Sequence, residues 1–202
     1  MLTLTGGWTF QNRGNVRLEM YQIGGASETG ERETLICNDH SVPPDKEPHV
    51  VSSKPRERGL HKIVMSDSGG RTLVEWPEGV PMVFDAALPD SKLTLDQKNK
   101  NARGVYFYVP KGTETLGFCA SCKTGGIYDS TGKVQWDFKA QPLIGFAELA
   151  VPLSERGKLW TFDGNGQFAL MTVPPVVALS GDELMLPKEV IPSNWLFRKK
   201  RL

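Results

Sequence analysis

The chain has 202 residues, of which 39% are hydrophobic and 23% are charged, a composition typical of folded globular proteins rather than disordered ones. Its formal net charge is only +1, so no overall field draws in nucleic acid or an anionic membrane. We therefore expect neither nucleic acid nor a membrane as a partner. A chain of this length can bury one large core or two small ones.

Signs of a targeting segment are scarce in the sequence. No stretch approaches the roughly 18 consecutive apolar residues of a membrane-spanning helix. The N-terminal MLTLTGGWTFQ lacks the basic start, apolar run and small-residue cleavage site of a signal peptide. We expect a cytoplasmic protein, or an extracytoplasmic one if the chain is cut from a longer exported protein.

Glycine and proline are frequent, with 21 and 14 residues, and the apolar runs between them are short and alternate with polar residues. This pattern predicts many short strands joined by turns. A brief helical turn is expected at residues 180–185, where Ser180 can cap the first turn and Pro187 ends it. The expected strands are residues 3–10, 16–23, 33–37, 61–66, 71–76, 80–85, 104–109, 115–120, 125–128, 133–138, 146–151, 158–163 and 168–173.

Residues 38–59 differ from the rest of the chain, because NDHSVPPDKEPHVVSSKPRERG is rich in proline and charge and has almost no apolar period. We predict a long loop here. The fold class is predicted to be all-β, an antiparallel jelly-roll β-sandwich with additional N-terminal strands or a small N-terminal β lobe. Residues 1–79 supply these N-terminal strands, either as part of the same domain or separately. Residues 80–187 form the sandwich and residues 188–202 a C-terminal tail.

Cys119 and Cys122 form a Cys-x-x-Cys pair, which raises the question of a metal or redox site. A structural zinc ion needs four nitrogen or sulfur ligands, usually from two such pairs, and the chain has no second pair. A redox pair needs a helix N-terminus to lower the thiol pKa, and none follows here. We therefore expect no metal site. Other possible zinc ligands are present, but their spacings match no zinc motif. They are Cys37, His40, His49 and His61.

Motifs for hydrolysis, zinc proteolysis or nucleotide binding are missing from the sequence. The carboxylates are scattered at turns, where aspartate is favoured for backbone reasons alone. The sequence therefore favours a protein without catalytic activity but does not exclude an enzyme. A small β-sandwich enzyme acting on polysaccharide would have to use groups such as His40, His61 or Arg103.

Aromatic residues offer the remaining indication of function. Sugar-binding sandwiches stack tyrosine or tryptophan rings on the apolar face of a pyranose. Alternation along residues 104–109 places Val105 and Phe107 in the core and the tyrosines at 106 and 108 on the other face. Trp136 and Trp160 are also interpreted as core residues. The candidate ligand-binding residues are Trp8, Trp76, Tyr106 and Tyr108.

The segments YFYVPKGTETLGF, GGIYDSTGKVQWDF, AVPLSERGKLWTF and LMTVPPVVAL, taken in this order, resemble a β-sandwich pattern of accessory domains in bacterial exported proteins. The pattern is similar to the galactose-binding-domain-like jelly rolls, a group that includes carbohydrate-binding modules. The resemblance covers about residues 104–187. It implies that Asp129 and Gly132 shape a hairpin, that Gly157 and Lys158 begin a strand, and that Trp160 fills the core.

The resemblance favours a non-catalytic carbohydrate-binding or accessory module that binds a glycan by ring stacking and loop hydrogen bonds. No cofactor is expected. Such domains often carry a structural calcium ion, but no tight cluster of Asp and Asn residues supports one here. The alternative is a structural or protein-interaction domain, whose partner would be another protein or the remaining domains of a parent chain. It would show an apolar surface patch or an exposed sheet edge.

Overall fold

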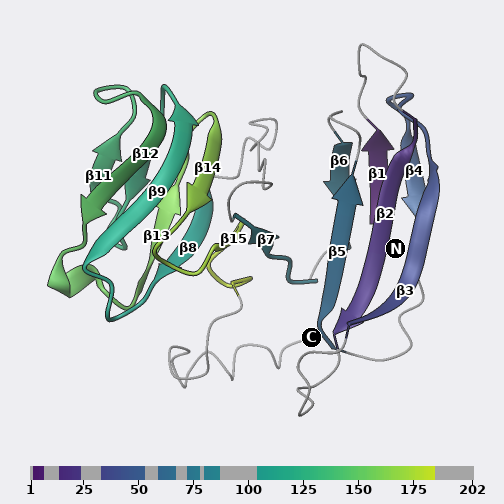
Figure 1. Cartoon of the computed structure of the whole chain (residues 1–202), viewed down its shortest axis with the longest axis horizontal. Coiled ribbons are helices and arrows are strands. Elements are labelled where there is room, and N and C mark those ends of the chain that lie inside the picture. Colours follow the sequence, from purple (N-terminus) through teal and green to yellow (C-terminus); the bar gives the residue numbers. More distant parts are fainter. Residues whose placement is uncertain are drawn as a thin grey trace. The chain divides into compact units, whose positions relative to one another are not determined.

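The structure is a computed structural model, shown in Figure 1. It describes residues 2–6, 14–23, 33–52, 59–66, 72–77, 80–86 and 104–184. These residues form fifteen strands and one short 3-10 helix, and every paired strand is antiparallel. The predicted all-β antiparallel sandwich is therefore confirmed, while a jelly-roll connectivity stays a prediction. The chain divides into two compact units, residues 1–80 and residues 81–202.

The N-terminal unit consists of two three-stranded sheets, ordered β4-β1-β6 and β3-β2-β5. Alternation explains the burial: in LTLTG the leucines Leu2 and Leu4 are buried, while Thr3 and Thr5, which follow them, are half-exposed. The other sheet buries Val16 and Leu18 of its central strand. The strands are β1 (Leu2–Gly6), β2 (Val16–Ile23), β3 (Glu33–Val42), β4 (Pro48–Val51), β5 (His61–Ser66) and β6 (Thr72–Glu75).

Residues 38–59 contain regular structure where the sequence predicts a loop. Strand β3 continues to Val42, and β4 occupies residues 48–51. Both are edge strands, so polar side chains reach solvent, and ladder hydrogen bonds with one neighbour hold the backbone. Pro48 is tolerated because it is the first residue of an edge strand, where its missing N–H does least harm.

The C-terminal unit contains a six-stranded sheet, β11-β10-β13-β8-β15-β7, and a three-stranded sheet, β12-β9-β14. Figure 1 shows β9, β12 and β14 side by side in the second of these sheets. The six-stranded sheet comprises β7 (Phe84–Asp85), β8 (Val105–Val109), β10 (Gly126–Tyr128), β11 (Val134–Asp137), β13 (Lys158–Phe162) and β15 (Val176–Ala178). The smaller sheet comprises β9 (Thr115–Cys122), β12 (Leu143–Ala150) and β14 (Gln167–Leu170), and the 3-10 helix η1 (Leu153–Glu155) precedes β13.

Aromatic rings from both sheets build the core of the C-terminal unit. Phe107 and Trp160 are completely buried, as predicted for the core, and Phe118 is buried with them. The Phe162 and Phe168 rings stack with 3.9 Å between their centroids. Each buried phenylalanine removes enough apolar surface from water to stabilise the fold by about 1.5–3 kcal/mol. Trp136 is half-buried at the margin of this core, with its ring 5.4 Å from that of Phe118.

Two local predictions differ from the structure in the last third of the chain. The sequence predicts a strand that continues after Leu170 to residue 173, but β14 ends at Leu170 and β15 follows at residues 176–178. Residues 171–173 form bends, and the prolines at 174 and 175, which cannot donate ladder hydrogen bonds, separate the two strands. The expected helix at 180–185 is a turn over the described residues up to Leu184, closed by a hydrogen bond from the Glu183 amide to the Ser180 carbonyl.

Candidate functional site

The outer face of the β3-β2-β5 sheet carries the most connected group of polar side chains in the described part of the N-terminal unit. On β2 the alternation of VRLEMYQI turns Val16 and Leu18 inward, so Arg17, Glu19 and Tyr21 share the opposite face. Their cross-strand partners on β5 are Ser66, Val64 and Lys62. We call this surface, from Arg17 to Lys62, the polar face.

Glu19 lies at the centre of the polar face. Its carboxylate accepts hydrogen bonds from the Arg17 guanidinium, with Nε to Oε1 at 3.1 Å, and from the Tyr21 hydroxyl, with Oη to Oε2 at 2.8 Å. The bonds from Tyr21 and Arg17 hold the pKa of Glu19 below its ordinary value. The same bond to Glu19 raises the pKa of Tyr21. The pair therefore presents an ionised carboxylate and a protonated phenol at neutral pH.

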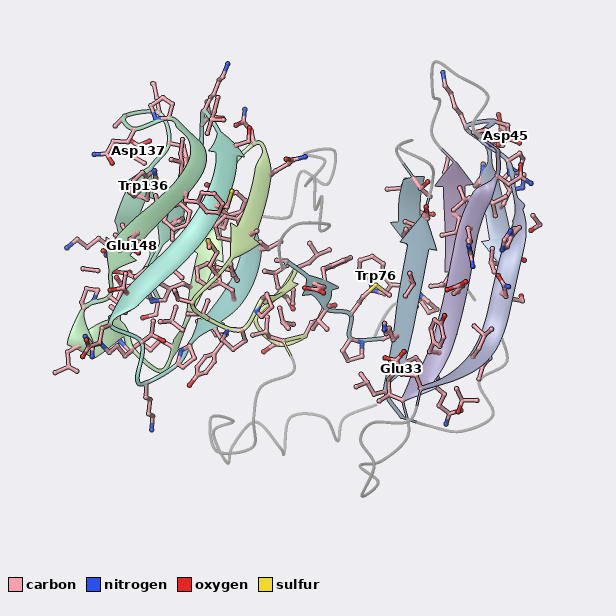
Figure 2. The ribbon with its side chains drawn as sticks, in the orientation of Figure 1. Glu33, Asp45, Trp76, Trp136, Asp137 and Glu148 are labelled. Atoms are coloured by element: carbon pink, nitrogen blue, oxygen red, sulfur yellow. The ribbon has the colours of Figure 1, made fainter. Side chains whose placement is uncertain are left out.

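A second ion pair extends the polar face toward one end of the sheet. Lys62 Nζ is 2.9 Å from Glu33 Oε1 and lies 5.6 Å from the centroid of the Tyr21 ring. The hydrogen bond to Glu33 raises the pKa of Lys62. Glu33 is labelled in Figure 2 at this end of the sheet. On β3, the His40 Nε2 and Asn38 Oδ1 atoms are 2.8 Å apart, and Asn38 pairs with Glu19 across the strands.

A shallow pocket of about 250 Å³ opens on the same face. It is lined by Arg17, Glu19, Val64 and Ser66. The Arg17 side chain is 57% exposed, whereas that of Glu19 is 17% exposed. A polar ligand in this pocket would therefore meet a guanidinium donor, a carboxylate acceptor, a hydroxyl and a small apolar surface at once.

The candidate ligand-binding residues belong to both units of the chain. Trp8 lies outside the described residues. Trp76 follows β6 in the N-terminal unit and is half-buried; Figure 2 labels it. Tyr106 and Tyr108 belong to the C-terminal unit, where Tyr106 is half-buried and Tyr108 is 8% exposed and packs with Ala178 and Leu184. The Tyr108 ring therefore offers little surface for stacking.

The Cys-x-x-Cys pair is divided between the two faces of its strand. Strand β9 continues through Cys122, so Cys119 lies on one face, half-buried, while Cys122 is buried in the core. Burial raises the pKa of the Cys122 thiol, which makes it a poor nucleophile. In the described part of the chain all three cysteines are free, and no three His, Cys, Asp or Glu side chains lie close enough together to hold a metal ion.

Of the groups suggested for a polysaccharide-acting enzyme, the two described histidines lie on different strands and contact different residues. His40 is exposed on the outer side of the sheet, where it contacts Asn38. The ring of His61 instead lies near its own chain, with Nδ1 3.1 Å from the Gly59 carbonyl oxygen. Arg103 lies outside the described residues. The third histidine, His49, is half-buried, and its Nε2 atom is 2.9 Å from Asp45 Oδ2.

The polar face was not predicted from the sequence, where the candidate binding residues were aromatic residues of other segments. The signal was present, since Arg17, Glu19 and Tyr21 alternate with apolar residues over a stretch correctly predicted as a strand. Arg-x-Glu-x-Tyr in an alternating strand predicts three functional groups in a row on one face. What the sequence did not reveal is which residues of β3 and β5 lie beside them.

No family model, curated protein or solved structure matches this chain. Among the described residues, no helix has the length and apolar character that crossing a bilayer requires. The resemblance to galactose-binding-like sandwiches thus stays an expectation, and only the geometry of this chain bears on its function.

Proposed function

We propose that this chain is a non-catalytic carbohydrate-binding module and that the polar face of its N-terminal unit contacts the glycan. The observation that carries the proposal is the hydrogen-bonded series Arg17–Glu19–Tyr21 beside a shallow pocket. Sugar hydroxyls both donate and accept hydrogen bonds, and a fixed guanidinium next to a fixed carboxylate serves both roles. Holding these side chains in place before binding lowers the entropy lost when a ligand binds.

The direction of the pKa shifts favours binding over catalysis. A general acid at neutral pH needs a carboxyl pKa raised toward 7, whereas the Tyr21 and Arg17 bonds lower that of Glu19. Tyr21 is held in its protonated form by its bond to Glu19. Both groups are therefore suited to hydrogen bonding with hydroxyls rather than to proton transfer.

The proposal is tested by glycan-array screening followed by isothermal titration calorimetry on the best neutral oligosaccharide. Glu19→Gln and Arg17→Ala should each weaken binding about 10-fold, because each removes a charge-assisted hydrogen bond. The matched control is Glu114→Gln, which changes an exposed carboxylate in the other unit. Tyr106→Ala and Trp76→Ala test the aromatic candidates in the same assay.

The polar-face assignment is wrong if a glycan binds and only the Tyr106 or Trp76 variants lose it. The carbohydrate-binding function itself is wrong if no glycan binds in the array or by calorimetry. Tyr21→Phe separates the two contributions of that residue, because it keeps the ring and removes the hydroxyl that donates to Glu19.

A further inference from the structure

The outer side of strand β12 exposes large apolar side chains that the described residues of the C-terminal unit leave uncovered. Ile144 is 80% exposed and Phe146 is 68% exposed, and the next outward residue is Glu148. We call these three residues the β12 strip. Figure 2 labels Glu148 on this strand. Two neighbouring apolar side chains exposed to this extent are typical of a surface that a partner covers.

The backbone of β12 is also free to pair. The strand is at the edge of the sheet β12-β9-β14, and its ladder hydrogen bonds in the described structure go to β9 alone. An unpaired edge with apolar side chains is a template for another strand. Gly145 lies between the two apolar residues with a φ of +128°, and no atom lies within 4 Å of the position that a Cβ would take there. Gly145 itself brings no side chain that a second strand would have to pack against.

We propose that two copies of this chain associate through their β12 strands, antiparallel and with the two Gly145 residues opposite each other. In this register Ile144 of each copy lies opposite Phe146 of the other copy. The dimer therefore contains two such pairs, in each of which an aromatic ring covers an aliphatic side chain. Centring the pair on Phe146 instead would place Ile144 opposite the Glu148 carboxylate. The apolar pattern therefore selects the Gly145 register.

The end of the paired region and its charges fit the same register. Glu148 of one copy then lies opposite Pro142 of the other, and Pro142 has no N–H, so it ends the ladder there. Lys123 of that second copy is one strand away, because it directly follows Cys122, which pairs with Leu143. The segment that carries Pro142 lies between Lys123 and the Glu148 carboxylate, with one strand spacing of about 4.8 Å on each side. Lys123 is exposed, and its long side chain can reach the carboxylate across this segment. The two-fold symmetry makes this contact twice, as an isologous interface requires.

The experiment is sedimentation equilibrium on the whole chain over a range of concentrations. The wild type should approach twice the chain mass of 22.3 kDa, and Phe146→Glu should remain at the monomer mass. The matched control is Leu153→Glu, which places the same charge at an apolar residue that is 79% exposed but lies in η1. It should dimerise like the wild type. Circular dichroism confirms that each variant is folded.

A charge exchange tests the register. Glu148→Lys and Lys123→Glu should each weaken dimerisation about 5-fold to 10-fold, and the double variant should restore it, because opposite charges then face each other again. The proposal is overturned if the wild type is monomeric at the highest concentration reached. It is also overturned if Phe146→Glu dimerises normally, if Leu153→Glu is equally monomeric, or if the double variant is no better than the single ones.

Discussion

Asp129 and Glu155 show how single carboxylates organise the turns of the C-terminal unit. Asp129 Oδ1 accepts hydrogen bonds from the Thr131 amide at 2.9 Å and the Lys133 amide at 3.0 Å, and Oδ2 accepts one from Gln135. Glu155 Oε2 accepts two hydrogen bonds from Ser130, and Oε1 pairs with Lys158 at 2.9 Å. The two nearly buried carboxylates therefore connect the β10–β11 turn to η1 and β13.

Both carboxylates have lowered pKa values in the folded chain, and this makes stability depend on pH. Burial alone would raise the pKa of Asp129, but the bonds from Thr131, Lys133 and Gln135 together outweigh it. For Glu155 the bond to Lys158 contributes most to the lowered pKa, followed by that to Ser130. The unfolded chain thus binds protons at a higher pH than the folded chain does. The stability from these groups is complete above their ordinary pKa values and is lost as the pH falls through the lowered ones.

We expect the free energy of unfolding to decrease below about pH 4.5, and Glu155→Gln to weaken this pH dependence. The variant should be less stable than the wild type at about pH 7, with the gap closing toward about pH 3, because the wild-type carboxyl is then protonated too. Urea unfolding at the two pH values measures this. Glu114→Gln, at an exposed carboxylate, is the control. An equal gap at both pH values would contradict the role assigned to Glu155.

At the scale of elements, the β10–β11 hairpin depends on a glycine at its turn. Gly132 has a φ of +83°, and its amide donates to the Asp129 carbonyl at 3.0 Å. Nothing lies within 4 Å of the position of an added Cβ, so space does not restrict the residue at this position. The backbone conformation alone restricts which residue can stand here, since a left-handed φ is unfavourable for residues with a side chain.

Substitutions at Gly132 should therefore follow left-handed propensity rather than side-chain size. We expect Gly132→Ala to cost about 1 kcal/mol, Gly132→Asn clearly less, and the β-branched Gly132→Val more. Thermal unfolding of the four proteins measures the order. Gly112→Ala is a suitable control, because this turn glycine has equally open surroundings without a positive φ. An equal loss at Gly112 would mean that the conformation of Gly132 is not the cause.

Strands with strict alternation were predictable from the sequence, and strands defined by their neighbours were not. The predicted bounds of β2 and β5 match the structure. In β2 the apolar residues Val16, Leu18 and Met20 recur at every second position, and in β5 the residues 63–65 form a short apolar run. Strands β4 and β15 begin at or directly after a proline and were missed, since pairing with β1, and with β7 and β8, makes them strands. Local sequence encodes the pleat, whereas ladder partners far along the chain are visible only in three dimensions.

The same distinction applies to the candidate site. Alternation correctly placed Tyr106 and Tyr108 on the face opposite Val105 and Phe107, but it could not show that Ala178 and Leu184 would cover Tyr108. Burial of an outward face depends on which distant segment folds over it. The polar face was encoded in β2 by three alternating residues, but its ion pair between Lys62 and Glu33 joins two other strands.

At the scale of the whole molecule, the two units have separate cores and carry separate surfaces. Every member of the large aromatic core, from Phe84 to Leu179, belongs to the C-terminal unit. The buried residues Leu4 and Leu18 belong to the N-terminal unit. The proposed glycan contact lies on the first unit and the β12 strip on the second. Such a division allows one unit to bind a ligand while the other holds two chains together.

Because all described members of its core lie in residues 81–202, we expect the fragment 81–202 to fold by itself. The sharpest measure is Phe118→Ala, which removes a completely buried ring and should cost about 3–5 kcal/mol. We expect the same loss of unfolding free energy in the fragment and in the whole chain. Urea unfolding monitored by tryptophan fluorescence measures it in both. A smaller loss in the fragment, or a fragment without cooperative unfolding, would show that the N-terminal unit is needed to form this core. An equal loss would make the C-terminal unit an independent domain, and sedimentation of the fragment would then test whether the β12 strip alone suffices for dimerisation.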